Sequence, residues 1–104
     1  MSKITPTIWF DGGVEEAAEF YVSLLPDSRI DSINCSPIDT PSGPAGQVLT
    51  AIVTLAGQRF CLLNGGPIFP QTEAVSFMIE TESQEETDRL WNAIVGNGGQ
   101  ESMC

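Results

Sequence analysis

The chain has 104 residues, of which 41% are hydrophobic, and fourteen acidic side chains against four basic ones give it a net charge of −10. This length allows one small domain, and the acidic balance disfavours binding to nucleic acids or to anionic membranes. Neither a signal peptide nor an apolar run of 18 residues is found, so we expect a cytoplasmic protein with no membrane partner.

The first predicted elements are a strand at residues 4–10 and a helix that begins at Val14. In the strand, ITPTIWF, polar and apolar positions alternate, so that Thr7 and Trp9 share one face. The sequence DGG breaks the strand. The apolar residues that follow recur at helical spacing and form one stripe, at Val14, Ala17, Ala18, Tyr21, Leu24 and Leu25. The three glutamates of this segment fall on the opposite side of the helix.

The rest of the chain alternates between predicted strands and turns, and then repeats the opening pattern. Strands are predicted at 29–34, 47–55 and 58–64, with a proline-rich loop at 36–46 and a tight hairpin at Ala56-Gly57. A further strand is predicted at 74–80. A capping box that starts at Ser83 predicts a second helix, whose apolar stripe contains Leu90, Trp91, Ile94 and Val95.

The two strand–helix units are related by an offset of 70 residues. Glu15 and Glu16 correspond to Glu85 and Glu86, and the apolar positions of the two helices also coincide. This pattern indicates an internal repeat. The first copy, residues 1–66, would be a complete βαβββ module, and the second, 73–104, would stop soon after its helix. We therefore expect a single domain over 1–104 whose second module is truncated, with an unpaired sheet edge suited to dimerisation or domain swapping.

A repeated βαβββ unit resembles the vicinal oxygen chelate (VOC) superfamily, which includes the glyoxalases. The stretches PTIWFDGGVEEAAEFYVSLLPDSRI, GQRFCLLNGGPIF and AVSFMIETESQEETDRLWN resemble its PhnB-like branch, which is labelled 3-demethylubiquinone-9 3-methyltransferase-like. The resemblance covers essentially the whole chain. It implies an α+β fold of paired βαβββ modules with mainly antiparallel, curled sheets, whose concave face forms a cavity. In this fold Ile8 and Phe10 would face the helix, although the two faces could be exchanged.

The sequence predicts no metal and no other cofactor. Metal-binding members of the superfamily use His and Glu on cavity-facing strands, but this chain has no His at all. Three cysteines without CxxC spacing predict neither a zinc site nor a disulfide framework. Without a His to act as base, Cys61 is interpreted as a core residue and not as a nucleophile. Methyl transfer, which the family label implies, lacks the G-x-G turn typical of nucleotide-type donors.

Four residues are the predicted ligand contacts, Thr7, Trp9, Asn64 and Phe77. Thr7 and Trp9 would line the cavity, and an indole there would form a wall for an aromatic or apolar ligand. Trp9 could equally fill the core of a small barrel. Asn64 ends a strand beside two glycines, where its amide could reach a ligand or cap a turn.

The expected function is therefore small-molecule binding in a half-barrel cavity without a histidine-ligated metal. Two alternatives remain at the sequence level: a structural or dimerisation module without catalysis, and a methyltransferase or lyase-type enzyme. A homodimer, which could be domain-swapped, is the expected assembly.

Overall fold

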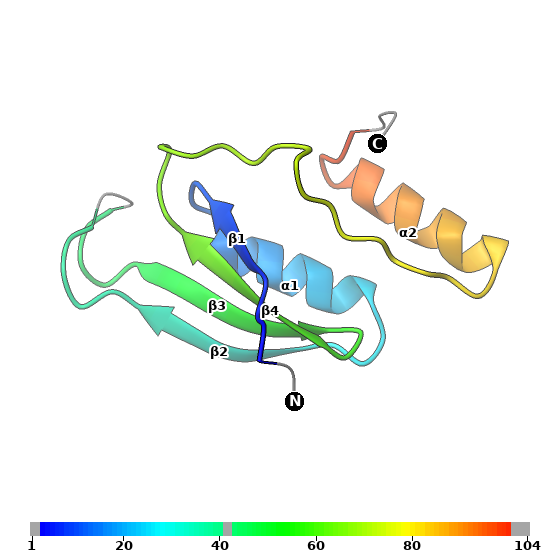
Figure 1. Ribbon diagram of the computed structural model, residues 1–104, viewed down its shortest axis with the longest axis horizontal. Coiled ribbons are helices and arrows are strands. Elements are labelled where there is room, and N and C mark those ends of the chain that lie inside the picture. The colour runs from blue at the N-terminus through cyan, green and yellow to red at the C-terminus, as the bar shows by residue number, and fades with distance from the viewer. Residues whose placement is uncertain (1–2, 41–42, 101–104) are drawn as a thin grey trace. The chain divides into compact units, whose positions relative to one another are not determined.

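The computed structural model describes residues 3–40 and 43–100, which belong to two compact units, Met1–Gln71 and Thr72–Cys104. The end of the chain at Cys104 lies outside the described residues. The first unit contains β1 (Thr7–Phe10), α1 (Val14–Leu24), β2 (Arg29–Cys35), β3 (Val48–Leu55) and β4 (Gln58–Asn64), and the second contains α2 (Gln84–Gly96) (Figure 1). Among the described helices, none has the length and apolar character that a membrane crossing requires.

The four strands form one mixed sheet in the order β1-β4-β3-β2. β1 runs parallel to β4, and the other two pairs are antiparallel. Ala56 and Gly57 both have positive φ and join β3 to β4, which confirms the predicted hairpin. The βαβββ order of the first unit is the predicted one, and so is the mainly antiparallel α+β architecture.

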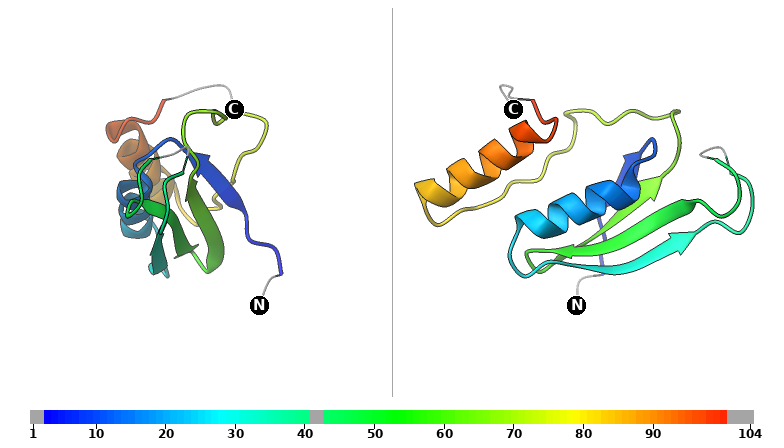
Figure 2. Two further views of the ribbon diagram at one scale, coloured as in Figure 1. Left: turned by 90° about the vertical axis from the view of Figure 1, so that its left-hand side faces the viewer. Right: turned by 180° about the vertical axis from the view of Figure 1, so that it is seen from behind.

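Helix α1 covers one face of this sheet (Figure 2). Five residues from α1, β3 and β4 form its buried core, namely Val14, Ala18, Ala51, Val53 and Leu62. Ile8 and Phe10 pack against this core, which confirms that they face the helix. The opposite face of the sheet, where Thr7 and Trp9 project from β1, is not covered by α1.

The turn that leads into α1 depends on two glycines. Gly12 and Gly13 have φ of 78° and 67°, a left-handed conformation that glycine adopts without steric cost. Glu15 and Glu16 lie in the first helical turn, where the helix dipole favours negative charge. Both are exposed, as is Glu19. The acidic residues of this stretch are therefore confirmed as the solvent face of a helix.

The first strand is shorter than predicted. It starts at Thr7 and not at residue 4. Pro6 has no N–H to donate to a ladder, although its carbonyl still accepts a hydrogen bond from the Cys61 N–H at 2.9 Å. Regular pairing with β4 accordingly begins only after the proline.

In the second unit the helix was predicted correctly and the strand was not. α2 begins at Gln84, 70 residues after the start of α1, and the Ser83 hydroxyl accepts a hydrogen bond from the Glu86 N–H at 3.1 Å. Residues 74–80 form no strand. A strand exists only where its backbone pairs with another. The apolar alternation of 74–80 is real, but the described residues supply it with no ladder.

Candidate functional site

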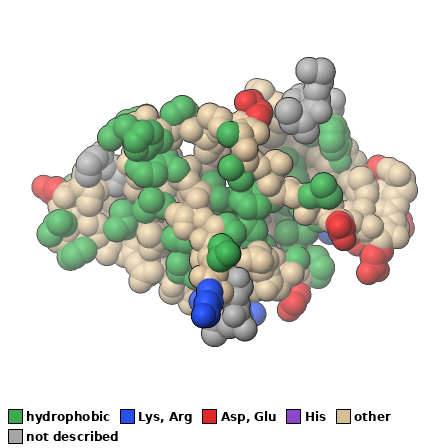
Figure 3. Space-filling view, viewed as in Figure 1, with side chains coloured by type: hydrophobic (Ala, Val, Ile, Leu, Met, Phe, Trp, Pro, Cys, Tyr) green, Lys and Arg blue, Asp and Glu red, His purple; other side chains and the backbone are tan. Residues whose placement is uncertain are grey.

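The sheet face opposite α1, called the open face below, is a grid of side chains from all four strands. Residues directly opposite each other in the strand registers point to the same side of a sheet. The registers place Trp9, Leu63, Thr50 and Asn34 in one row, Thr7, Cys61, Ile52 and Ser32 in a second, and Arg59, Thr54 and Arg29 in a third. We call these the Trp9 row, the Cys61 row and the arginine row. Hydrophobic side chains gather over the strands on the side viewed in Figure 3.

At one end of the open face, the loop after β4 holds the indole of Trp9. Its Nε1–H donates a hydrogen bond to the Gly66 carbonyl at 2.8 Å, and its ring meets Phe69 edge to face with centroids 5.1 Å apart. Gly65 lies so close to the indole that a Cβ at this position would overlap the ring. These contacts fix the orientation of a side chain that remains half-buried.

A shallow, open depression of about 360 Å³ adjoins Trp9 within the first unit. It is lined by Trp9, Phe10, Asp11, Gly12, Pro67, Phe69, Pro70 and Gln71. The Gln71 amide donates to the Trp9 carbonyl at 2.6 Å and so holds the end of the loop against β1. The depression therefore depends on the contacts that position the indole.

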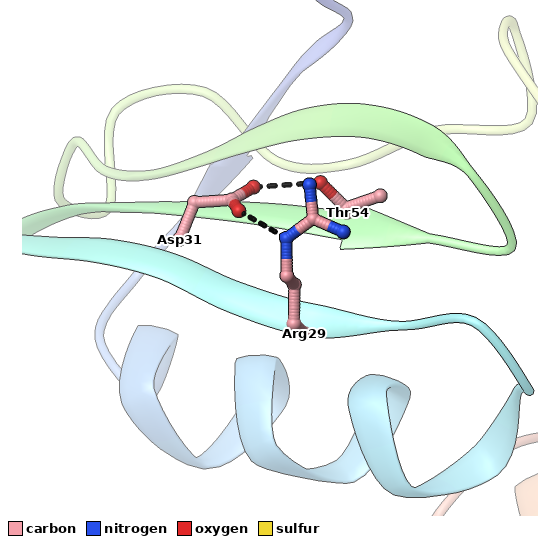
Figure 4. A network of polar contacts seen from close by, with 3 residues as sticks. All are labelled: Arg29, Asp31 and Thr54. Atoms are coloured by element: carbon pink, nitrogen blue, oxygen red, sulfur yellow. Dashed lines mark hydrogen bonds and ion pairs between the residues drawn. The ribbon is translucent and has the colours of Figure 1, made fainter.

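At the other end of the open face, Asp31 connects the side chains of two strands (Figure 4). Its carboxylate accepts a hydrogen bond from the Thr54 hydroxyl at 2.7 Å and one from Arg29 Nε at 2.8 Å. A register irregularity in β2 between Ile30 and Ser32 turns Asp31 toward this face. The hydrogen bond from Thr54 lowers the pKa of Asp31 below its ordinary value, and the charges of Arg29 and Arg59 act in the same direction.

Replacement of Thr54 by valine is expected to raise the pKa of Asp31 toward its ordinary value, because the strongest stabiliser of the carboxylate is lost. A carboxyl whose pKa is lowered by folding stabilises the native state above its unfolded pKa, near 4. That contribution disappears as the pH falls through the folded pKa. The stability difference between wild type and Thr54→Val should therefore shrink below about pH 4.

A ¹³C NMR titration of the Asp31 carboxyl measures this pKa directly. Thr50→Val is the matched control, since Thr50 lies on the same strand and face but bonds to Asn34 at 3.3 Å and not to Asp31. An Asp31 titration that moves equally in both variants would contradict the role given to Thr54.

The four predicted ligand contacts do not all come together. Thr7 and Trp9 lie on the open face, in neighbouring rows. Asn64 is directly opposite Phe10 and so belongs to the α1 side, where it is 8% exposed. Its Oδ1 accepts a hydrogen bond from the Gly12 N–H at 3.0 Å, and its Nδ2 donates one to the Val48 carbonyl at 3.2 Å. The amide therefore has a structural role. Phe77 belongs to the second unit.

The open face does not fit the metal site that the superfamily implies. Apart from the Asp31 carboxylate, its strand positions carry Trp, Thr, Ser, Asn, Cys, Leu, Ile and Arg, and the chain has no His. Within 3–40 and 43–100, no three His, Cys, Asp or Glu side chains are grouped closely enough to hold a metal ion.

Comparison with known proteins decides the family. The sequence model of the family described as 3-demethylubiquinone-9 3-methyltransferase matches residues 2–104. The chain belongs to this family. Family members of this kind are PhnB-like proteins, and the VOC-type fold predicted from the sequence is therefore confirmed. No curated protein matches the chain.

Two solved structures support the family assignment. A PhnB protein from Bacillus cereus, described by the same methyltransferase name, is 35% identical, with a TM-score of 0.79 over 90% of this chain and 74% of that one. A protein from Staphylococcus aureus is 27% identical, with a TM-score of 0.51 over 93% of this chain and 70% of that one. The PhnB-like fold thus extends over most of the sequence.

The methyltransferase name of the family implies a methyl donor, and the turn between β1 and α1 does not have the glycine-rich form that donors of the nucleotide type use. Donors of the nucleotide type bind at a glycine-rich turn between a parallel strand and a helix, through free backbone N–H groups. The turn between β1 and α1 has two glycines, but the Gly12 N–H is already donated to Asn64.

The arginine row was not predicted from the sequence. Part of the row could have been predicted, because the two-residue hairpin at Ala56-Gly57 sets the register that places Thr54 opposite Arg59. Arg29 joins them only through the pairing of β2 with β3, which has irregularities that periodicity does not reveal. Long-range register was the missing information.

Proposed function

We propose that the domain binds a small organic molecule on the open face, without a histidine-ligated metal. The observation that carries this proposal is that α1 covers one face of the sheet, while the other presents half-buried apolar side chains at its centre. Ile52, Cys61 and Leu63 are half-buried there, between a held indole and polar residues. An apolar floor with a few convergent polar groups is the usual composition of a ligand site.

The open face would bind and orient a ligand. Its described residues do not include a nucleophile that is paired with a general base. A ligand that covers the Cys61 row would remove apolar surface from water at about 25 cal/mol per Å². Trp9 would border the ligand at one end, since its ring is already fixed by Gly66 and Phe69. A fixed side chain loses little entropy when a ligand binds, which favours affinity.

Cysteine alkylation tests this proposal even while the ligand is unidentified. Cys61 is half-buried in the middle of the open face, and Cys35 is an exposed thiol at the end of β2. A ligand on the open face should slow the reaction of Cys61 with N-ethylmaleimide and leave that of Cys35 unchanged, as read by peptide mass spectrometry. The screen uses small aromatic and aliphatic acids, amides and alcohols.

Leu63→Ala should reduce the protection of Cys61, because it removes apolar surface beside the thiol. Ile38→Ala is the matched control, since Ile38 is 67% exposed and belongs to the loop after β2. If no compound class protects Cys61, or if both thiols are protected equally, the proposal is wrong.

A second candidate function is self-association through the second unit. Residues 74–80 expose a run of apolar side chains, with Val75, Phe77, Met78 and Ile79 exposed by 71%, 50%, 88% and 44%. Such a run is typical of an association surface. On α2, Trp91 is 51% exposed although its stripe predicts packing. A homodimer would cover side chains of this kind.

Light scattering over a range of concentrations should then show dimers whose dissociation constant rises at least about tenfold in Phe77→Ser/Met78→Ser. Ile4→Ser/Ile38→Ser is the control, because it replaces two exposed apolar residues of the first unit. A strict monomer at millimolar concentration would exclude this function.

A further inference from the structure

We propose that the arginine row recognises a carboxylate, so that the ligand of the open face is a monocarboxylic acid with an apolar body. This inference rests on the small-molecule binding proposed above and specifies its ligand class. It is carried by the position of Arg29, Thr54 and Arg59 in one row, where Arg29 and Thr54 both donate hydrogen bonds to the Asp31 carboxylate.

The charge of the row is unusual for this chain. The sequence has only four basic residues against fourteen acidic ones, and two of the four lie in this row. Within the row, the two guanidinium groups and the Asp31 carboxylate sum to a charge of +1; the Asp27 carboxylate lies at the adjoining hairpin, beside Gly57. A single carboxylate would neutralise this charge. A phosphate dianion would leave a local excess of negative charge in a chain whose net charge is already −10.

The hydrogen bonds of the row leave donors available for a ligand. Asp31 engages Nε of Arg29, and the Arg29 side chain is 65% exposed. No hydrogen bond or ion pair joins the Arg59 side chain to another side chain in the described part of the protein, although its charge acts on Asp31. A guanidinium edge can bind a carboxylate through two parallel N–H donors. Asp31 therefore occupies only the Nε edge of Arg29, and its negative charge competes with a ligand carboxylate for the two guanidinium groups.

The grid also sets the length of the ligand. Neighbouring rows are two residues apart along a strand, or about 7 Å, and the Trp9 row is about 13 Å from the arginine row. Ile52 and Cys61 lie between them. An apolar body of about 7–13 Å would thus cover the middle row while its carboxylate reaches the arginines. An arylalkanoic acid has this shape.

Two probes that differ only in charge test the inference, 4-phenylbutanoate and 4-phenylbutanamide. Isothermal titration calorimetry on the full chain should give about tenfold tighter binding of the carboxylate, the contribution of about one charge-assisted hydrogen bond. Its affinity should fall as salt is added, whereas that of the amide should not. Both probes should protect Cys61 from alkylation.

Three variants separate the arginine row from general effects of charge. Arg59→Gln should weaken the binding of 4-phenylbutanoate about five- to tenfold and leave the affinity for 4-phenylbutanamide unchanged. Arg89→Gln, on α2, makes the same change in net charge elsewhere and should have no effect. Asp31→Asn removes the negative charge of the row, which raises the charge of the row to +2. It should increase the affinity for 4-phenylbutanoate severalfold. A misfolded variant would lose affinity, so misfolding cannot produce this gain.

The outcomes distinguish this inference from the proposed function. Equal affinities for the two probes, with Cys61 protected by both, would overturn the arginine row as a recognition site and leave the proposed function standing. Binding of neither probe, with Cys61 protected by another compound class, would overturn the inference alone, and protection of Cys61 by no compound class would overturn both. Tighter binding of 4-phenylbutyl phosphate than of the carboxylate would overturn the assignment of a carboxylate ligand.

Discussion

Gly65→Ala is expected to destabilise the first unit by about 2–4 kcal/mol, a large effect for the addition of one methyl group. The φ of Gly65 lies outside the left-handed region, so backbone strain is not the cause. The cause is the indole of Trp9, which occupies the space that the new Cβ requires.

The expected loss of stability is estimated from the cost of overpacking and from the contacts that the indole would lose. Overpacking a filled site costs about 1–3 kcal/mol. If the ring moves away, the hydrogen bond to the Gly66 carbonyl is lost, at about 0.5–1.5 kcal/mol. The edge-to-face contact with Phe69 adds a similar amount. Small domains have a total stability of only about 5–15 kcal/mol, so a change of this size is easily measured.

Urea unfolding followed by circular dichroism tests this expectation with two comparisons. Gly46→Ala is the control, because Gly46 has φ of 92° but open space around it, so that alanine there meets backbone strain without overlap. The second comparison repeats Gly65→Ala in a Trp9→Leu background, where the smaller side chain should remove most of the added cost. An equal cost of Gly65→Ala in both backgrounds would show that the indole is not responsible.

The elements that the sequence predicted well are those defined by local spacing. The apolar stripe of α1 begins at Val14, as the structure has it, and the Ala56-Gly57 hairpin has the positive φ values that its residues indicate. The alternation in β1 also predicted that Ile8 and Phe10 share one face, and both pack against the core. In each case the pattern and the contacts that it reports lie within a few residues of each other.

The misses involve partners that are distant in the sequence. Residues 74–80 alternate like a strand, but alternation does not supply a hydrogen-bonded neighbour. The sequence allowed Asn64 either to reach a ligand or to cap a turn, and it could not indicate that its amide bonds to Gly12 and Val48, which are 52 and 16 residues away. The arginine row depends on the pairing of three strands. Periodicity contains no information about these pairings.

Asn64→Leu is the second substitution with a large expected effect, a loss of about 2–4 kcal/mol. Leucine has a similar volume but leaves the Gly12 N–H and the Val48 carbonyl without their partner. Each buried polar group that loses its partner costs about 1–3 kcal/mol. Asn34→Leu is the matched control, because Asn34 is exposed, and it should change the free energy of unfolding by less than about 0.5 kcal/mol.

Asn64→Asp should give the protein a stability that falls as pH rises, opposite to the usual behaviour of a carboxylate. An ionised aspartate at this site would still accept from Gly12 but would place a negative charge against the Val48 carbonyl, in a position that is 8% exposed. Burial and this carbonyl both favour the protonated form, whose O–H can donate to Val48, so the folded pKa should lie above the unfolded value near 4.

A group with a raised folded pKa contributes its stability fully below the unfolded pKa and loses it as the pH rises through the folded pKa. Chemical unfolding of Asn64→Asp between pH 4 and pH 8 should therefore show a decline relative to wild type over this range. A constant difference between the two proteins would mean that residue 64 is solvated, and that its amide does not hold the turn between β1 and α1 to β3.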